Sequence, residues 1–60
     1  SDSKSTVEAL LESLRILIAL EREILSLAGD ADDEGTLALM SEYLSAQEKT
    51  VWMFASFLNK

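Results

Sequence analysis

The chain lacks cysteine, histidine and proline, and it has only two glycines among its 60 residues. Without cysteine it forms no disulfide, and without cysteine or histidine it lacks the usual ligands of a structural zinc ion. The same absences leave no Cys or His for nucleophilic catalysis, and no glycine-rich loop is present to bind phosphate. We therefore expect no catalysis from this chain alone.

Basic residues are also scarce: five Lys and Arg stand against eleven Asp and Glu, and the net charge is −6. This balance does not suit a phosphate backbone, which is bound by clustered Lys and Arg. The longest apolar stretch is broken at residues 21–23, short of the roughly 18 residues of a membrane span. Residues 1–6 are polar, unlike a signal peptide. We therefore expect a cytoplasmic chain without membrane contact.

The pattern predicts two helices, at about 6–28 and about 33–59, joined by a turn at 29–32. Ser5 and Glu8 have the spacing of a capping box, and Gly29 is suited to the left-handed position after a helix. Acidic residues at 30–34 supply a cap and negative charge for the second helix. Because the helices match in length, the predicted fold class is all-α, with the two helices antiparallel as a hairpin in one domain, 1–60.

Both helices carry apolar surface wider than one partner needs. In the first helix it spans roughly 220°, whereas packing on a single neighbour takes an apolar stripe of about 100° or a little more. Another helical layer must cover the rest, through self-association or a larger bundle. The residues expected at that interface are Leu20, Leu27 and Phe57, together with Trp52, an aromatic anchor on the otherwise polar side of the second helix.

Glu21 lies within the apolar stripe of the first helix, where a carboxylate is costly unless it is hydrogen-bonded, paired or protonated. A turn at Gly29 predicts facing residues whose numbers add to about 61–64, which places Glu21 beside Met40 and Tyr43 and out of reach of Gln47. We expect a buried Glu21 hydrogen-bonded to Tyr43 or to a polar group of a second chain; a metal ligand or buried acid is the alternative. Gln47 is interpreted as a residue that sets register.

Asp30, Asp32, Glu34 and Gly35 fit the first half of an EF-hand loop. The twelfth position, which needs a bidentate carboxylate, is Ser41, so capping explains these acids better than calcium. A di-iron bundle would need Glu-x-x-His pairs, and the chain contains none.

Three segments resemble the last helix of the Dps-type mini-ferritins: Gly29–Thr36, Leu39–Tyr43 and above all Gln47–Phe54, with its Lys-x-x-Trp-Met pattern. The stretch Val7–Ala28 is similar to the third bundle helix of the same family. The resemblance implies the C-terminal half of a ferritin-like four-helix bundle. A missing N-terminal half or self-association would complete that bundle.

Members of this family form twelve-subunit shells that oxidise and store iron, and many bind and protect DNA. Their ferroxidase ligands and Lys-rich tails have no counterpart here, so the resemblance implies iron and DNA only for a parent protein. Glu34 matches an acid of the family's three-fold pore and Asp30 or Asp32 approximates another, while Ala38 stands where some members have Asp. The predicted function is a C-terminal fragment of a Dps-like iron-storage and DNA-protection protein. The alternative is a stand-alone helical oligomerisation module without catalytic activity.

Overall fold

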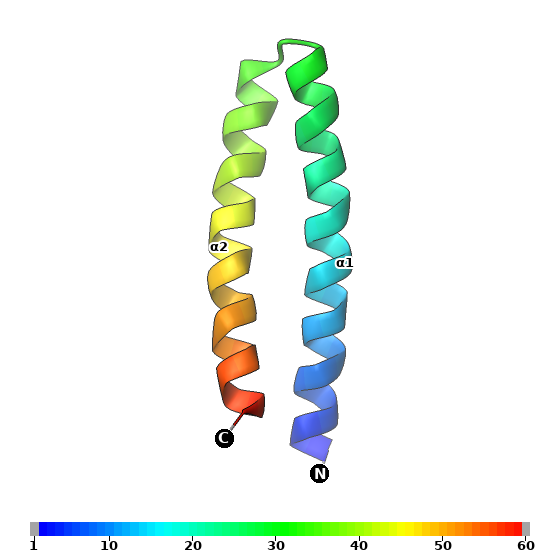
Figure 1. The fold of residues 1–60 in the computed structure, drawn as a ribbon, viewed down its shortest axis with the longest axis vertical. Helices are drawn as coiled ribbons and strands as arrows, with labels where there is room; N and C mark the ends of the chain where they lie inside the picture. Colours follow the sequence, from blue (N-terminus) through cyan, green and yellow to red (C-terminus); the bar gives the residue numbers. More distant parts are fainter. Residues whose placement is uncertain (1, 60) are drawn as a thin grey trace.

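The computed structural model describes residues 2–59, which form two helices, α1 (Asp2–Asp30) and α2 (Glu34–Leu58). The helices run antiparallel and side by side, with both chain ends at the end opposite the turn (Figure 1). The hairpin is a rod of 46 × 15 × 12 Å. This confirms the predicted all-α hairpin. α1 begins four residues before its predicted start and runs two residues past its predicted end, whereas α2 is one residue shorter than predicted at each end.

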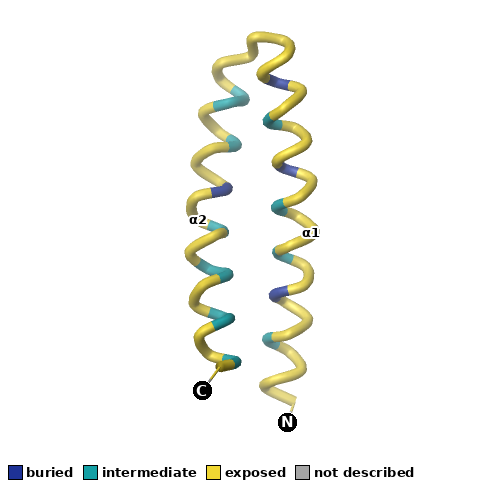
Figure 2. Tube along the Cα trace, viewed as in Figure 1, coloured by how far each residue is buried: buried dark blue, intermediate teal, exposed yellow. Residues whose placement is uncertain are grey.

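The interface between the helices is built from one residue every three or four positions in each helix. This alternating spacing keeps a single stripe of a helix turned toward its neighbour. All members of the stripe are buried or half-buried, whereas most other positions are exposed (Figure 2). In α1 they are Val7, Leu11, Leu14, Ile18, Glu21, Leu25 and Ala28, and in α2 they are Leu37, Met40, Leu44, Gln47, Val51, Phe54 and Leu58.

The turn differs from the predicted one. Gly29 stays within α1, and the left-handed residue is Asp32, with a φ of 54°. The amide of Asp33 donates to the carbonyl of Ala28 at 2.8 Å, and that of Asp32 donates to Gly29 at 3.2 Å. These two bonds are the pair that closes a Schellman motif, so α1 ends three residues later than a left-handed Gly29 would allow.

Asp33 then begins the second helix. Its side chain accepts from the Thr36 amide at 3.1 Å and from the Thr36 hydroxyl at 2.6 Å. Asp33 is thus the N-cap of α2, as the acidic segment predicts in outline. The capping box predicted at Ser5 and Glu8 is wrong, because α1 begins at Asp2 and Ser5 lies inside it.

Candidate functional site: a buried polar pair beside an uncovered apolar face

Glu21 and Gln47 are the only two polar residues of the interface stripe. Glu21 is 6% exposed, and its Oε2 accepts a hydrogen bond of 2.9 Å from Nε2 of Gln47. Their side chains also hold two buried oxygens that have no hydrogen-bond partner among the described residues, Oε1 of Glu21 and Oε1 of Gln47. A buried acceptor without a donor costs free energy, so this pair is incompletely satisfied within a single hairpin.

The predicted pairing of Glu21 with Tyr43 is wrong. The numbers of Glu21 and Gln47 add to 68, above the expected 61–64, because the helix reverses at Asp32 instead of Gly29. Tyr43 precedes Leu44, which faces α1, and therefore lies about 100° round the helix from the interface. It is 46% exposed.

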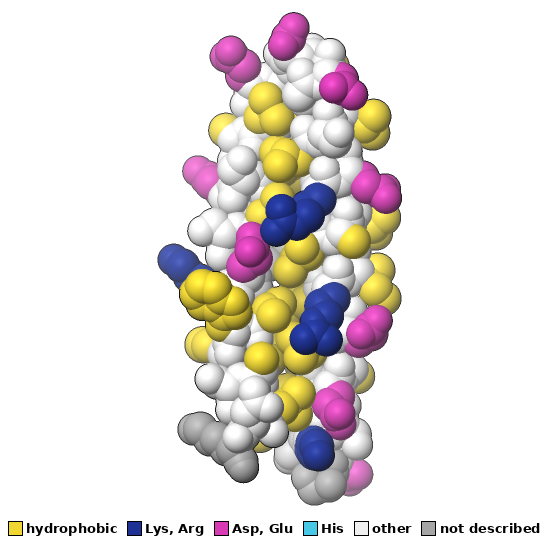
Figure 3. Space-filling view, viewed as in Figure 1, with side chains coloured by type: hydrophobic (Ala, Val, Ile, Leu, Met, Phe, Trp, Pro, Cys, Tyr) yellow, Lys and Arg dark blue, Asp and Glu magenta, His cyan; other side chains and the backbone are white. Residues whose placement is uncertain are grey.

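The residues that come one position after each member of the interface stripe form the polar side of the hairpin. Arg22 follows Glu21, Glu48 follows Gln47, and the two side chains form an ion pair of 3.3 Å at the surface. Charged side chains flank the apolar band between the helices on the face shown in Figure 3. An exposed ion pair of this kind contributes about 0.2–1 kcal/mol, so it orients the helices more than it holds them together.

The residues that come one position before each member of the interface stripe form an apolar face on the opposite side of the hairpin. In an antiparallel pair the preceding positions of both helices share one side, just as the following positions share the side of Arg22 and Glu48. The large apolar side chains there are all exposed, and we call this set the apolar face: Leu10, Leu17, Leu20, Ile24, Leu27, Leu39, Tyr43, Met53 and Phe57. It includes three residues that the sequence predicts at an interface, Leu20, Leu27 and Phe57.

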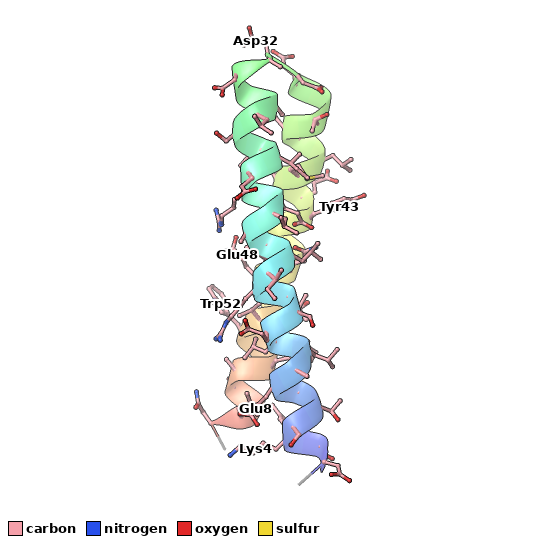
Figure 4. The ribbon with its side chains drawn as sticks, turned by 90° about the vertical axis from the view of Figure 1, so that its right-hand side faces the viewer. Lys4, Glu8, Asp32, Tyr43, Glu48 and Trp52 are labelled. Carbon is pink, nitrogen blue, oxygen red and sulfur yellow. The ribbon has the colours of Figure 1, made fainter. Side chains whose placement is uncertain are left out.

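Trp52 lies away from the apolar face. It is 73% exposed, and Figure 4 shows it on the side of Glu48, opposite Tyr43. A shallow depression beside Trp52 is lined by Ser41, Leu44, Ser45, Glu48 and Lys49. An exposed indole next to such a depression fits an anchor for a second contact, separate from the apolar face.

The acids of the turn do not converge. Asp33 is engaged as the N-cap, and the hydrogen bonds from the Thr36 hydroxyl and amide hold the pKa of its carboxyl below the ordinary value of 3.8. Asp30, Asp32 and Glu34 are exposed. Within residues 2–59, no three His, Cys, Asp or Glu side chains lie close enough together to hold a metal ion. No helix in the same range is long and apolar enough to cross a membrane.

Comparison with known families assigns the fold. The ferritin-like domain matches residues 1–60. The chain belongs to the ferritin-like family. It is 45% identical over 56 residues to the DNA protection during starvation protein of Porphyromonas gingivalis, covering 93% of this chain and 35% of that protein. It is 44% identical over 54 residues to an uncharacterized protein of Haemophilus influenzae, covering 90% of this chain and 34% of that protein.

The chain therefore spans about a third of the length of the curated relatives it matches. Among solved structures there is no significant match. A ferritin-like bundle packs four helices, so a hairpin of this family with one uncovered apolar face has the shape of two helices of such a bundle.

Proposed function

We propose that this hairpin supplies two helices to the four-helix bundle of a Dps-like subunit, a protein that oxidises and stores iron and protects DNA. The observation that carries the proposal is the uncovered apolar face, which runs along both helices of a chain whose full length matches the ferritin-like domain. Similarity to the DNA protection during starvation protein supports the same function. The setting we propose is cytoplasmic.

The role of the chain in such a subunit is structural. It has no histidine, and the carboxylates of its described residues form no metal cluster. Ferrous iron, as substrate, would therefore react at groups outside this chain. In a twelve-subunit shell, Asp30, Asp32 and Glu34 at the turn would line an entrance that attracts cations, since each carries an exposed carboxylate.

A chimera tests this function. In it, the 56 matching residues of the Porphyromonas gingivalis protein are replaced by the corresponding residues of this chain. We expect the chimera to match the unaltered relative in assembled mass and in the rate of ferrous-iron oxidation. As a matched pair, Leu20→Lys on the apolar face should prevent assembly, whereas Ile16→Lys, at an equally exposed position outside it, should not. A folded chimera that stays monomeric or fails to oxidise iron would contradict the proposal.

The alternative, a helical oligomerisation module without catalysis, predicts a different result. The chimera would then fold as a helical protein but would not reproduce the mass of the relative, while the 60-residue chain would assemble by itself. In either case we expect the isolated chain to oxidise ferrous iron no faster than buffer, as measured by oxygen consumption.

A further inference from the structure

The strip of positions that come one before each interface residue carries no charged side chain between Thr6 and Phe57. It holds the apolar face and five residues that are small or carry a hydroxyl: Thr6, Ser13, Thr36, Ala46 and Thr50. The hairpin exposes 4482 Å², whereas a compact monomer of this mass exposes about 3,900 Å². The excess of roughly 600 Å² approaches the approximately 800 Å² that each partner buries in a standard interface. Composition and area therefore both indicate a strip that is buried in the assembled protein.

Most of the hydroxyl groups on this strip need no partner outside the hairpin. The hydroxyl of Thr50 donates to the carbonyl of Ala46 at 3.2 Å, and that of Thr36 donates to the N-cap side chain at 2.6 Å. Serine and threonine side chains are short enough to reach a carbonyl of the preceding helical turn, as Thr50 does. Thr6 and Ser13 can be satisfied within α1 in the same way, so covering the strip strands none of these four groups.

Tyr43 is different, because its hydroxyl lies at the far end of the ring and cannot reach the backbone of its own helix. It makes no hydrogen bond with any other residue of the range 2–59. Figure 4 shows the side chain pointing away from both helices. A buried phenol hydroxyl usually has a hydrogen-bond partner, since an unpaired one loses its bond to water without replacement. When the apolar face is covered, the partner of Tyr43 must come from the covering layer.

The charge of the hairpin indicates the chemistry of that partner. Tyr43 directly follows a stretch, residues 21–42, that holds seven acids and one base and accounts for the whole net charge of −6. The rest of the chain is balanced. A further carboxylate placed against this half of the hairpin would be repelled, whereas a donor with positive or partial positive charge would be attracted. The phenol oxygen can accept a hydrogen bond from such a donor.

We propose that the helices covering the apolar face carry a nitrogen donor opposite Tyr43, an amide, imidazole, guanidinium or ammonium group, which donates to Oη of Tyr43. The inference rests on the proposed function, because the covering helices are then the other two helices of the same four-helix subunit. It adds one specific polar contact to a layer that otherwise needs only apolar side chains.

Tyr43→Phe tests the contact, because it removes the hydroxyl and keeps the ring. In the chimera with the Porphyromonas gingivalis protein, where the face is covered, we expect the equilibrium constant for unfolding in urea to rise about tenfold. In the isolated chain it should stay within about twofold. Thr50→Val is the matched control, since it removes a hydroxyl of the same strip that is already bonded within α2. It should have the same effect in both proteins.

A crystal structure of the chimera tests the chemistry of the partner. We expect a side-chain nitrogen from outside the hairpin within about 3.2 Å of Oη of Tyr43. A carboxylate or only water at that place would overturn the inference. So would an equal effect of Tyr43→Phe in the isolated chain and in a chimera that assembles and oxidises iron, a result that leaves the proposed function intact. A chimera that does not assemble would overturn both proposals.

Discussion

Glu21 of α1 accepts a hydrogen bond of 2.9 Å from Gln47 of α2, and this bond joins the only two polar side chains of an otherwise apolar interface. A carboxylate that is only 6% exposed depends on its donor, because water cannot replace it. The pair therefore ties the relative position of the two helices to a polar contact instead of to packing alone.

Removing the hydrogen-bond donor alone should lower the stability of the chain more than removing both members of the pair. Gln47→Leu leaves the Glu21 carboxylate buried without its partner, and we expect it to lower the free energy of unfolding by about 1–3 kcal/mol. The double variant Glu21→Leu, Gln47→Leu should be neutral or more stable than the parent, since no buried polar atom is stranded. Urea denaturation at one fixed chain concentration measures both. A double variant as unstable as Gln47→Leu would show that packing, not the stranded carboxylate, causes the loss.

Tyr43→Phe should change stability by no more than about 0.5 kcal/mol, because the side chain is 46% exposed and does not contact Glu21 through a hydrogen bond. Thermal unfolding followed by circular dichroism is a sufficient measurement. A loss of several degrees in the melting temperature would show that the phenol hydroxyl has a partner, which would have to come from another chain.

The hairpin can be predicted from the sequence, whereas the register of its two helices cannot. Apolar periodicity and the absence of proline predict two long helices, and Asp33 is recognisable as a cap because an acidic segment precedes the second apolar pattern. The register depends on which residue takes the left-handed conformation. Glycine is the usual residue there, yet Asp32 takes it and moves the facing positions by about one helical turn. The signal that could have revealed this is the regular spacing of the interface stripe, which continues through both Glu21 and Gln47.

Acid should weaken the cap of α2. The pKa of Asp33 is lowered in the folded chain by its hydrogen bonds from Thr36, so its stabilising contribution is complete above the ordinary value of 3.8 and is lost as the pH falls below it. We expect Asp33→Ala to lower the melting temperature at about pH 6 and to reduce the additional loss between about pH 4 and pH 2. Asp33→Asn retains an acceptor, so its melting temperature should lie between those of the parent chain and Asp33→Ala. Equal pH slopes in all three chains would show that other carboxylates dominate.

Asp32→Gly should stabilise the chain by roughly 0.5–1 kcal/mol, because a side chain in the left-handed region carries a steric cost that glycine avoids. Asp32→Val should destabilise by about 1–2 kcal/mol for the same reason. Asp30→Gly, a substitution inside α1, is the matched control and should destabilise. Chemical denaturation distinguishes the three; a loss of stability in Asp32→Gly would mean that the aspartate side chain, and not the backbone, holds the turn.

The two ends of the rod differ in local stability, and amide hydrogen exchange should show this difference. At the turn, the amides of Asp32 and Asp33 donate to carbonyls of the last turn of α1, and the Asp33 side chain caps α2 at Thr36. At the other end α1 extends beyond α2 (Figure 1), and its first buried residue is Leu11, which leaves the opening turns of the helix with little to pack against. Local unfolding of the helix pair therefore starts at the chain termini and proceeds toward the turn. The protection of backbone amides against hydrogen exchange should rise steadily from the termini to Ala28.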